Sequence, residues 1–498
     1  MGERKTDAIV LGAGVAGLTA AYELTKRGCT VTVVEAAPFA GGRTSTYVDA
    51  RGRTVDTGLH VLADHYVNLT EVLAELGMSK KIRWIGKHTY LREGRGSLEW
   101  YFSDHKPPLH LVRPMLEMPI SLLERAPLLR ASLEVAGYGQ EDLAELDHVT
   151  YFEWHQRRKL GAGFIRELAE AAADAASFLT IREAAARPVL SWLKYLMRNK
   201  RAGDVGLFEG TMEECMVEPL RRFIEAHGGE VRLGTAAREL VFDGTRITGV
   251  RVGRSGARGP CTRADGYVEP AGQGAPEAEV LRADYVVSAL PVQMLQRILG
   301  AELGAAAGLT DALGLTTTPA ISAILWFDRK IFPAPPGAPL VTGCAMRDFV
   351  DLATLGRQGG APGSVYQFVV TRGQEGSDGE IAERLFTDLK RVWPAARDVT
   401  LIDWAIEHIG AAMFAAVPGA HAKRPAAETA IGNFFLAGDF TKHDLNASME
   451  GAAFSGRRAA ERVLAAKGKP ATIVRRIAEP WVTERLRRVR KRAAAVRP

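Results

Sequence analysis

Short apolar runs alternate with helical patterns at the start of this 498-residue chain. Asp7 to Leu11 has the nearly unbroken hydrophobicity of a strand buried on both faces, and a helical pattern follows it directly. A second apolar run at Val31 to Val34 has the same character. Two such strands joined by a helix predict a parallel β-α-β unit at the N-terminus.

The pattern changes twice further along the chain. Residues 85–205 carry mostly helical periodicity, whereas residues 320–425 hold alternating strands, with a helix between the later ones. Buried-strand patterns return near residue 210 and again near residue 433. We therefore predict an α/β fold in which one Rossmann-like domain is built from residues 1–84, 206–300 and 426–466. A helical region (85–205), a mixed-sheet domain (301–425) and a C-terminal tail (467–498) complete it.

Composition limits the protein classes. Hydrophobic residues make up 47% of the chain and charged residues 24%, as in ordinary globular proteins. No run of 18 uncharged apolar residues occurs, and the N-terminus has no apolar signal region, so we expect a cytoplasmic location. The four cysteines share no metal-ligand spacing, which predicts reduced thiols and no metal site.

Basic residues concentrate in the tail. The net charge is +6, yet the segment from Lys467 onward has 11 Lys and Arg against two acidic residues, so the rest of the chain is slightly acidic. Between Thr472 and Arg492 the tail mixes arginine with Ile, Val, Leu and Trp, as an interfacial helix would. An anionic membrane surface is the favoured partner. A solvated tail is the alternative, and no recognition motif supports nucleic acid.

A leucine-rich segment is the second candidate for membrane contact. Residues 119–137 are strongly amphipathic. A core-facing helix pair and a lip that dips into a membrane both explain this pattern, and the sequence leaves the choice open. A Gly- and Pro-rich stretch near residues 255–278 predicts a surface loop.

The turn after the first strand carries the clearest chemistry. Gly12, Gly14 and Gly17 form a G-x-G-x-x-G pattern, in which the glycines allow a tight turn, an approach of backbone amides to a pyrophosphate, and close helix packing. Glu35 follows the second strand, where a carboxylate meets a ribose hydroxyl. Arg43, after Gly41 and Gly42, supplies donors suited to phosphate. These features predict an adenine dinucleotide.

A second constellation lies more than 400 residues later. The strand-like run Asn433 to Thr441 contains A-G-D, ending at Asp439, and a helix rich in small residues opens near Ala447. Asp439 would accept a hydrogen bond from a polyol hydroxyl, and the helix N-terminus would face a polar or anionic group. Together with the N-terminal turn, this narrows the predicted cofactor to FAD.

These motifs resemble those of the flavin-dependent carotenoid desaturases in the amine oxidase superfamily, and also those of hydroxysqualene dehydroxylases. The resemblance rests on G-A-G-V-A-G-L, Glu35, G-G-R, T-G-L-H with Asn68, W-F-D-R-K from Trp326, and A-G-D-F-T with A-S-M-E-G-A. It covers the chain up to about residue 466.

The resemblance implies a role for each matching residue. Glu35 takes the adenosine ribose, Ala237 binds adenine through its backbone, and the region of Gly58, Leu59 and His60 lies near the flavin ring. Asp439 holds the ribityl or pyrophosphate region, and Ser448 and Met449 direct backbone amides at the flavin. The full predicted cofactor set is Gly12, Ala13, Gly14, Ala16, Gly17, Glu35, Ala36, Gly42, Arg43, Gly58, Leu59, His60, Ala237, Gly438, Asp439, Ser448 and Met449.

The favoured hypothesis is an FAD-dependent oxidoreductase that desaturates a long apolar polyprenoid at a membrane surface. Dehydroxylation or isomerisation of such a substrate, oxidation of an amine, and a non-catalytic flavoprotein scaffold are the alternatives. No catalytic acid or base is assigned. His60, His443, Asp444 and Glu450 lie near the flavin motifs, and a structural role is favoured for each. The oligomeric state is left open.

Overall fold

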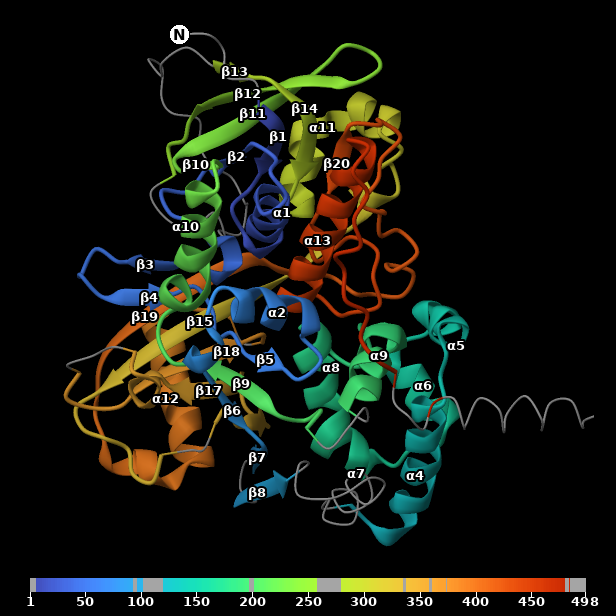
Figure 1. The fold of residues 1–498 in the computed structure, drawn as a ribbon. Helices are drawn as coiled ribbons and strands as arrows, with labels where there is room; N and C mark the ends of the chain where they lie inside the picture. Colours follow the sequence, from blue (N-terminus) through green and yellow to red (C-terminus); the bar gives the residue numbers. More distant parts are fainter. Residues whose placement is uncertain are drawn as a thin grey trace, which may run out of the picture.

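The computed structural model describes residues 6–92, 96–101, 120–196, 201–257, 279–334, 337–357, 361–372, 374–479 and 483. Its upper half in Figure 1 is built on a five-stranded sheet whose neighbouring strands are all parallel, in the order β10-β2-β1-β14-β20. These strands are β1 (Thr6–Leu11), β2 (Val31–Val34), β10 (Glu230–Arg232), β14 (Ala283–Ser288) and β20 (Phe434–Leu436). Segments more than 400 residues apart in sequence therefore share one sheet, as predicted.

Both faces of this sheet are covered, which explains the unbroken hydrophobicity of its strands. Alternate residues of β1 point to opposite faces. Ala8 and Val10 join a cluster with helices α1 (Val15–Thr25), α2 (Val67–Glu75), α10 (Glu218–Ala226) and α13 (Met449–Ala466). Ile9 and Leu11 face the antiparallel strands β11 (Thr235–Phe242), β12 (Ile247–Arg254) and β13 (Glu279–Leu281), with helix α11 (Val292–Ala306).

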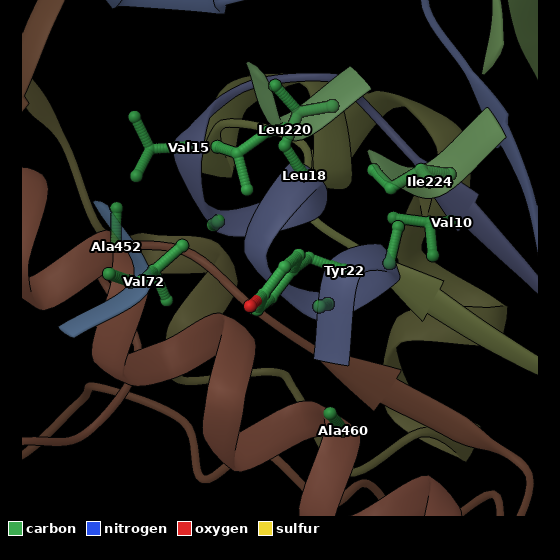
Figure 2. Close-up of a cluster of buried hydrophobic side chains, with 14 of the residues drawn as sticks. Val10, Val15, Leu18, Tyr22, Val72, Leu220, Ile224, Ala452 and Ala460 are labelled. Carbon is green, nitrogen blue, oxygen red and sulfur yellow. The ribbon is translucent and has the colours of Figure 1, made fainter. Parts of the chain in front are cut away.

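Helix α1 lies at the centre of the first cluster. Figure 2 shows Leu18 and Tyr22 of α1 between Leu220 of α10 and Ala460 of α13. The approach of α13 to α1 is very close, because a Cβ atom on Gly456 would lie 2.3 Å from the carbonyl oxygen of Ala16. This contact fixes the two helices whose N-termini carry the predicted cofactor residues.

The second large element is a seven-stranded mixed sheet, at the lower left of Figure 1. Its order is β19-β15-β18-β17-β16-β7-β8, and only β16 and β7 pair in parallel. Its strands are β7 (Lys87–Arg92), β8 (Gly96–Tyr101), β15 (Thr317–Phe327), β16 (Leu340–Thr342), β17 (Met346–Asp351), β18 (Val365–Val370) and β19 (Leu401–Phe414). Helix α12 (Asp378–Val392) packs on one face through Leu385 and Phe386.

Residues 85–205 are predicted to be mostly helical with few strands, and the strands lie at the two ends of this segment. β7 and β8 lie in that segment and extend the mixed sheet. Three further strands, β5 (Leu62–Ala63), β6 (Ile82–Ile85) and β9 (Val205–Phe208), form a small sheet, and β3 (Thr46–Val48) pairs with β4 (Thr54–Asp56). At the end of the segment, β9 pairs with β5 and β6, more than 100 residues earlier, whereas β7 and β8 pair with each other and β7 joins the sheet through β16.

The part of the segment from residue 120 to residue 196 is mainly helical, as predicted, and lies at the lower right of Figure 1. It contains α4 (Leu122–Ala136), α5 (Gln140–Glu145), α6 (Tyr151–Arg157), α7 (Ala162–Phe164), α8 (Glu170–Ser177) and α9 (Ala186–Leu196). Helix α4 buries Leu128 and Val135 and leaves Leu122 and Leu123 76% and 89% exposed. The buried face agrees with the core-facing interpretation of the leucine-rich segment, and contact of the exposed leucines with a membrane stays a prediction.

The beginning of the basic tail is not helical, which corrects the interfacial-helix prediction for residues 472–479. These residues lie along the protein instead. The backbone amides of Ile473 and Val474 donate to Glu461, and Arg475 exchanges hydrogen bonds with the side chain of Asn68. The rest of the predicted tail helix, apart from Thr483, and nearly all of the loop at 255–278 lie outside the described residues.

Candidate flavin site

The glycine turn joins β1 to α1 with almost no free space. Gly12 has a φ of +97°, a conformation that side chains other than glycine rarely adopt. A Cβ atom on Gly17 would lie 1.9 Å from the carbonyl oxygen of Gly12, far inside any permitted contact. The tight turn at Gly12 and the packing role of Gly17 are thus confirmed by the geometry.

The N-terminus of α1 opens onto a cavity of about 520 Å³. Gly14 caps the helix without a side-chain hydrogen bond, so the first amides of α1 lack a capping side chain. A Cβ atom on Gly14 would meet only the carbonyl oxygen of Gly41, 3.9 Å away, and would otherwise enter the cavity. A pyrophosphate that enters the cavity can therefore accept hydrogen bonds from these amides, because no side chain caps them.

Glu35 sits at the end of β2 and is held in place by two backbone amides. Ala13 donates to one carboxylate oxygen at 2.8 Å, and Ala37 donates to the other at 2.9 Å. Burial raises the pKa of Glu35, and these hydrogen bonds act in the opposite direction. Glu35 lines the cavity. Its side chain is therefore fixed in the wall of the cavity with lone pairs left for a hydroxyl.

The cavity collects nearly all of the predicted residues. Ala36 and Ala237 line it, as do the three residues Gly58, Leu59 and His60 and the helix residues Ser448 and Met449. Only two predicted residues do not line it. Ala13 contributes its amide to Glu35, and Gly17 packs against the turn. The predicted residues that do line it are Gly12, Gly14, Ala16, Glu35, Ala36, Gly42, Arg43, Gly58, Leu59, His60, Ala237, Gly438, Asp439, Ser448 and Met449.

Arg43 and Asp439 form an ion pair that the sequence did not indicate. The two guanidinium nitrogens of Arg43 donate to the two carboxylate oxygens of Asp439 at 3.1 and 2.8 Å, and Arg43 also donates to the carbonyl oxygen of Ala412. The side chains were predicted to face a phosphate and a polyol separately. In the structure they face each other, so each brings only its remaining hydrogen-bonding capacity to the cavity.

Helix α13 presents its N-terminus at the same cavity. The hydroxyl of Ser448 accepts a hydrogen bond from the amide of Gly451 at 3.1 Å and so caps the helix. Met449, the first residue of the helix, and Ala452 also line the cavity. Thus α1 and α13 direct two N-terminal ends at one cavity, and a ligand with polar groups at two positions fits them.

Arg424 holds the loop between β20 and α13. Its buried guanidinium donates to the carbonyl oxygens of Asp439, Thr441 and His443 at 2.9, 2.5 and 2.9 Å, and its Nε donates to Phe440. Burial lowers its pKa to about 9. No motif marked this residue, because its partners are backbone atoms that come together only in the folded chain.

The four candidate acid and base groups lie in different places. His60 lines the cavity, and burial lowers its pKa to about 4, so it is neutral near pH 7. His443 and Asp444 line a separate pocket of about 20 Å³ beside Arg424. Burial lowers the pKa of His443 well below its usual value. Of His60, His443 and Asp444, only His60 therefore lines the large cavity.

Glu450 is buried in the first turn of α13 and faces the N-terminus of α2. It accepts hydrogen bonds from the backbone amides of Asn68 and Leu69 and from the side chain of Asn68. Burial raises its pKa to about 7, against these hydrogen bonds. Glu450 therefore connects α13 to α2, which supports the structural role favoured for it.

The residues present fit a flavin dinucleotide. A helix terminus without a side-chain cap lies at Gly14, where a methyl group would enter the cavity, and Glu35 lies in the cavity wall. Asp439 and the N-terminus of α13, at Ser448 and Met449, line the same cavity and offer polar groups to the rest of such a ligand.

Comparison with known proteins agrees with this geometry. The family described as "Flavin containing amine oxidoreductase" matches residues 15–464. A zeta-carotene desaturase from Synechocystis sp. is 25% identical, with 93% of this chain and 98% of that protein covered. A 15-cis-phytoene desaturase from Synechococcus elongatus is 26% identical, with 92% and 95% covered.

Solved structures share the fold. Cyclohexylamine oxidase from Brevibacterium oxydans superimposes with a TM-score of 0.63 at 18% identity, covering 93% of this chain and 99% of its own. An oxidoreductase from Methanosarcina mazei gives a TM-score of 0.64 at 19% identity, with 90% and 98% covered. The expected mixed α/β fold and the expected flavin are thereby confirmed. With FAD as its cofactor, the chain is an oxidoreductase and belongs to the flavin containing amine oxidoreductase family.

Proposed function

We propose that this flavoprotein desaturates a long apolar polyprenoid, as the carotenoid desaturases it resembles do. The observation that carries the proposal is the apolar wall that the mixed sheet gives the cavity. Ala320, Val369, Ile409 and Met413 of the sheet line it, together with Phe178 at the end of α8. Apolar walls of this kind suit a hydrocarbon chain, because each buried CH₂ group contributes about 0.8 kcal/mol.

The cofactor and the protein would contribute different parts of the reaction. Bound FAD supplies hydride acceptance, and desaturation of a C–C bond removes one hydride and one proton. The chain's own residues would hold the dinucleotide at α1 and Glu35, keep water out with the apolar wall, and align the substrate beside His60. With a pKa of about 4, His60 is a weak base, so we assign it a hydrogen-bonding role.

Anaerobic mixing of the purified holoprotein with phytoene or zeta-carotene tests this function. We expect the absorption band of oxidised flavin to bleach and a product with an additional double bond to form, detected by chromatography. Putrescine and cyclohexylamine are tested separately in the same assay as comparison substrates. Bleaching by an amine and by no polyprenoid would establish amine oxidation instead. No bleaching by any substrate would support the scaffold alternative.

We also propose that the protein works at a cytoplasmic membrane surface, where such a substrate dissolves. No helix among the described residues is long and apolar enough to span a bilayer. Helix α4, however, exposes Leu122 and Leu123 almost completely, and Leu129 and Leu133 by 42% and 49%. Exposed leucines on one amphipathic helix are typical of shallow insertion into a bilayer.

Replacing Leu122 and Leu123 with glutamate is expected to lower vesicle binding by about tenfold or more, since each buried leucine contributes about 1.5–3 kcal/mol. Cosedimentation with phosphatidylglycerol vesicles measures the effect. Val48→Glu is the matched control, because Val48 is 68% exposed on β3, away from α4. Equal binding of the double variant and the control would contradict a role of α4 at the membrane.

A further inference from the structure

One positively charged side chain, that of Arg347, lies among the apolar residues that line the cavity. Arg347 of β17 lines it beside Val369, yet its side chain is only 10% exposed. We propose that Arg347 binds a neutral oxygen atom, a hydroxyl or a carbonyl, on the long apolar ligand that enters the cavity. This inference rests on the function proposed above, and it changes the preferred ligand from a pure hydrocarbon to one that carries oxygen.

The backbone at Arg347 is built to direct this side chain. The register between β17 and β18 shifts here, because Met346 pairs with Val370 and Asp348 pairs with Val369, which leaves Arg347 as an extra residue. Such β-bulges re-aim a side chain and occur often beside active sites. The guanidinium lies 4.9 Å from the ring centre of Phe178, which also lines the cavity. Arg347 is therefore held at the wall by its strand and by an aromatic ring.

The hydrogen bonds of Arg347 are incomplete. One terminal nitrogen donates to Asp348 at 2.9 Å. The buried Nε is closed off from the cavity, whereas the other terminal nitrogen, Nη1, is not buried and has no hydrogen-bond partner among the described residues. Arginine only donates, so the missing partner must be an acceptor, and an oxygen atom is the natural one. A hydrocarbon would leave this donor unsatisfied, at a cost in binding.

The surrounding charges favour a neutral oxygen over an anion. Asp348 pairs with Arg347 and compensates its charge. Asp174, on α8, is also buried and interacts electrostatically with both Arg347 and Asp348. A carboxylate or phosphate on the ligand would meet a guanidinium that is already neutralised and at least one acidic side chain. A hydroxyl or carbonyl would keep the hydrogen bond without that repulsion.

Two kinds of ligand carry such an oxygen. It belongs either to an oxygenated polyprenoid substrate or to a quinone that reoxidises the flavin. Binding to the oxidised holoprotein separates them when the flavin absorption spectrum is followed during titration. The probes are geranylgeraniol, the corresponding hydrocarbon, geranylgeranoic acid and decylubiquinone.

For the wild-type protein, we expect geranylgeraniol or decylubiquinone to bind about tenfold more tightly than the hydrocarbon, since a hydrogen bond to a charged donor has about this value. Arg347→Met should reduce that preference to less than about twofold. Arg372→Met is the matched control, because Arg372 lies nearby, is exposed, and does not line the cavity. It should retain the full preference. Dependence of only one of the two probes on Arg347 identifies the source of the oxygen.

Three results would overturn the inference: equal affinity for the alcohol, the quinone and the hydrocarbon, tighter binding of the acid than of the alcohol, or an unchanged preference in Arg347→Met. If Arg347→Met does not fold, Arg347→Met/Asp348→Asn removes both charges of the pair and is tested in its place. Because these titrations measure binding, they can succeed even if carotenes fail to reduce the flavin. A failure of the proposed function is therefore distinguishable from a failure of this inference.

Discussion

Replacing Gly17 with alanine is expected to yield protein without flavin. The added Cβ atom would lie 1.9 Å from the carbonyl oxygen of Gly12 and 3.2 Å from the Cβ of Ala289. The nearest obstacle is backbone, so either the turn or α1 must move. Overpacking of this kind costs about 3 kcal/mol or more, and the displaced parts are the amides that face the cavity. We expect flavin affinity to fall by at least about a hundredfold.

Flavin content after purification and FAD titration of the apoprotein measure this effect. Gly314→Ala is the matched control, because a Cβ atom there has no neighbour within 4 Å. Gly14→Ala separates packing from binding. Its Cβ atom meets only one atom, at 3.9 Å, so the variant should fold normally and lose affinity only because the methyl group enters the cavity. Normal flavin content in Gly17→Ala would show that the turn can relax, contrary to the close packing seen here.

Replacing Arg424 with methionine is expected to destabilise the protein by about 3 kcal/mol or more. Arg424 supplies donors to the carbonyl oxygens of Asp439, Phe440, Thr441 and His443. Each buried polar group left without a partner costs about 1–3 kcal/mol. Because Asp439 belongs to this loop and pairs with Arg43, we also expect weaker flavin retention.

Chemical denaturation followed by circular dichroism gives the loss of stability, and released FAD gives the loss of retention. Lys423→Met serves as the control, since Lys423 is the exposed neighbour of Arg424. Arg424→Lys should restore little, because one ammonium group cannot reach carbonyl oxygens spread around a planar fork. If Arg424→Met keeps wild-type stability, water can replace the guanidinium, and the loop does not depend on it.

The cofactor site could be predicted largely because its signals are local. The tight turn at Gly12, the close packing at Gly17 and the carboxylate at the end of β2 depend on a few neighbouring residues, and their pattern is visible in the sequence. Residues whose roles depend on distant partners could not be found in that way. Arg424 acts on backbone carbonyls, and Arg347 acquires its position from a register shift between two strands.

The errors have the same origin. β7 and β8 pair with each other, and the contact that joins them to the mixed sheet is the pairing of β7 with β16, about 250 residues later. Residues 472–479 combine apolar and basic side chains as an interfacial helix does, yet Asn68 and Glu461 bind their backbone in an irregular conformation. Tertiary contacts outweighed local propensity in both cases.

By itself, the sequence determined that this chain has a parallel nucleotide-binding sheet, that its first turn suits a pyrophosphate, and that its two ends meet at one cofactor. Those conclusions follow from short-range patterns, since glycine and carboxylate positions are set by backbone geometry within a few residues. Only the tertiary structure decided that Arg43 pairs with Asp439 and that Arg347 lines the cavity among apolar residues. The physical reason is that ion pairs and cavity walls join residues far apart in sequence, and their geometry exists only when the whole chain is folded.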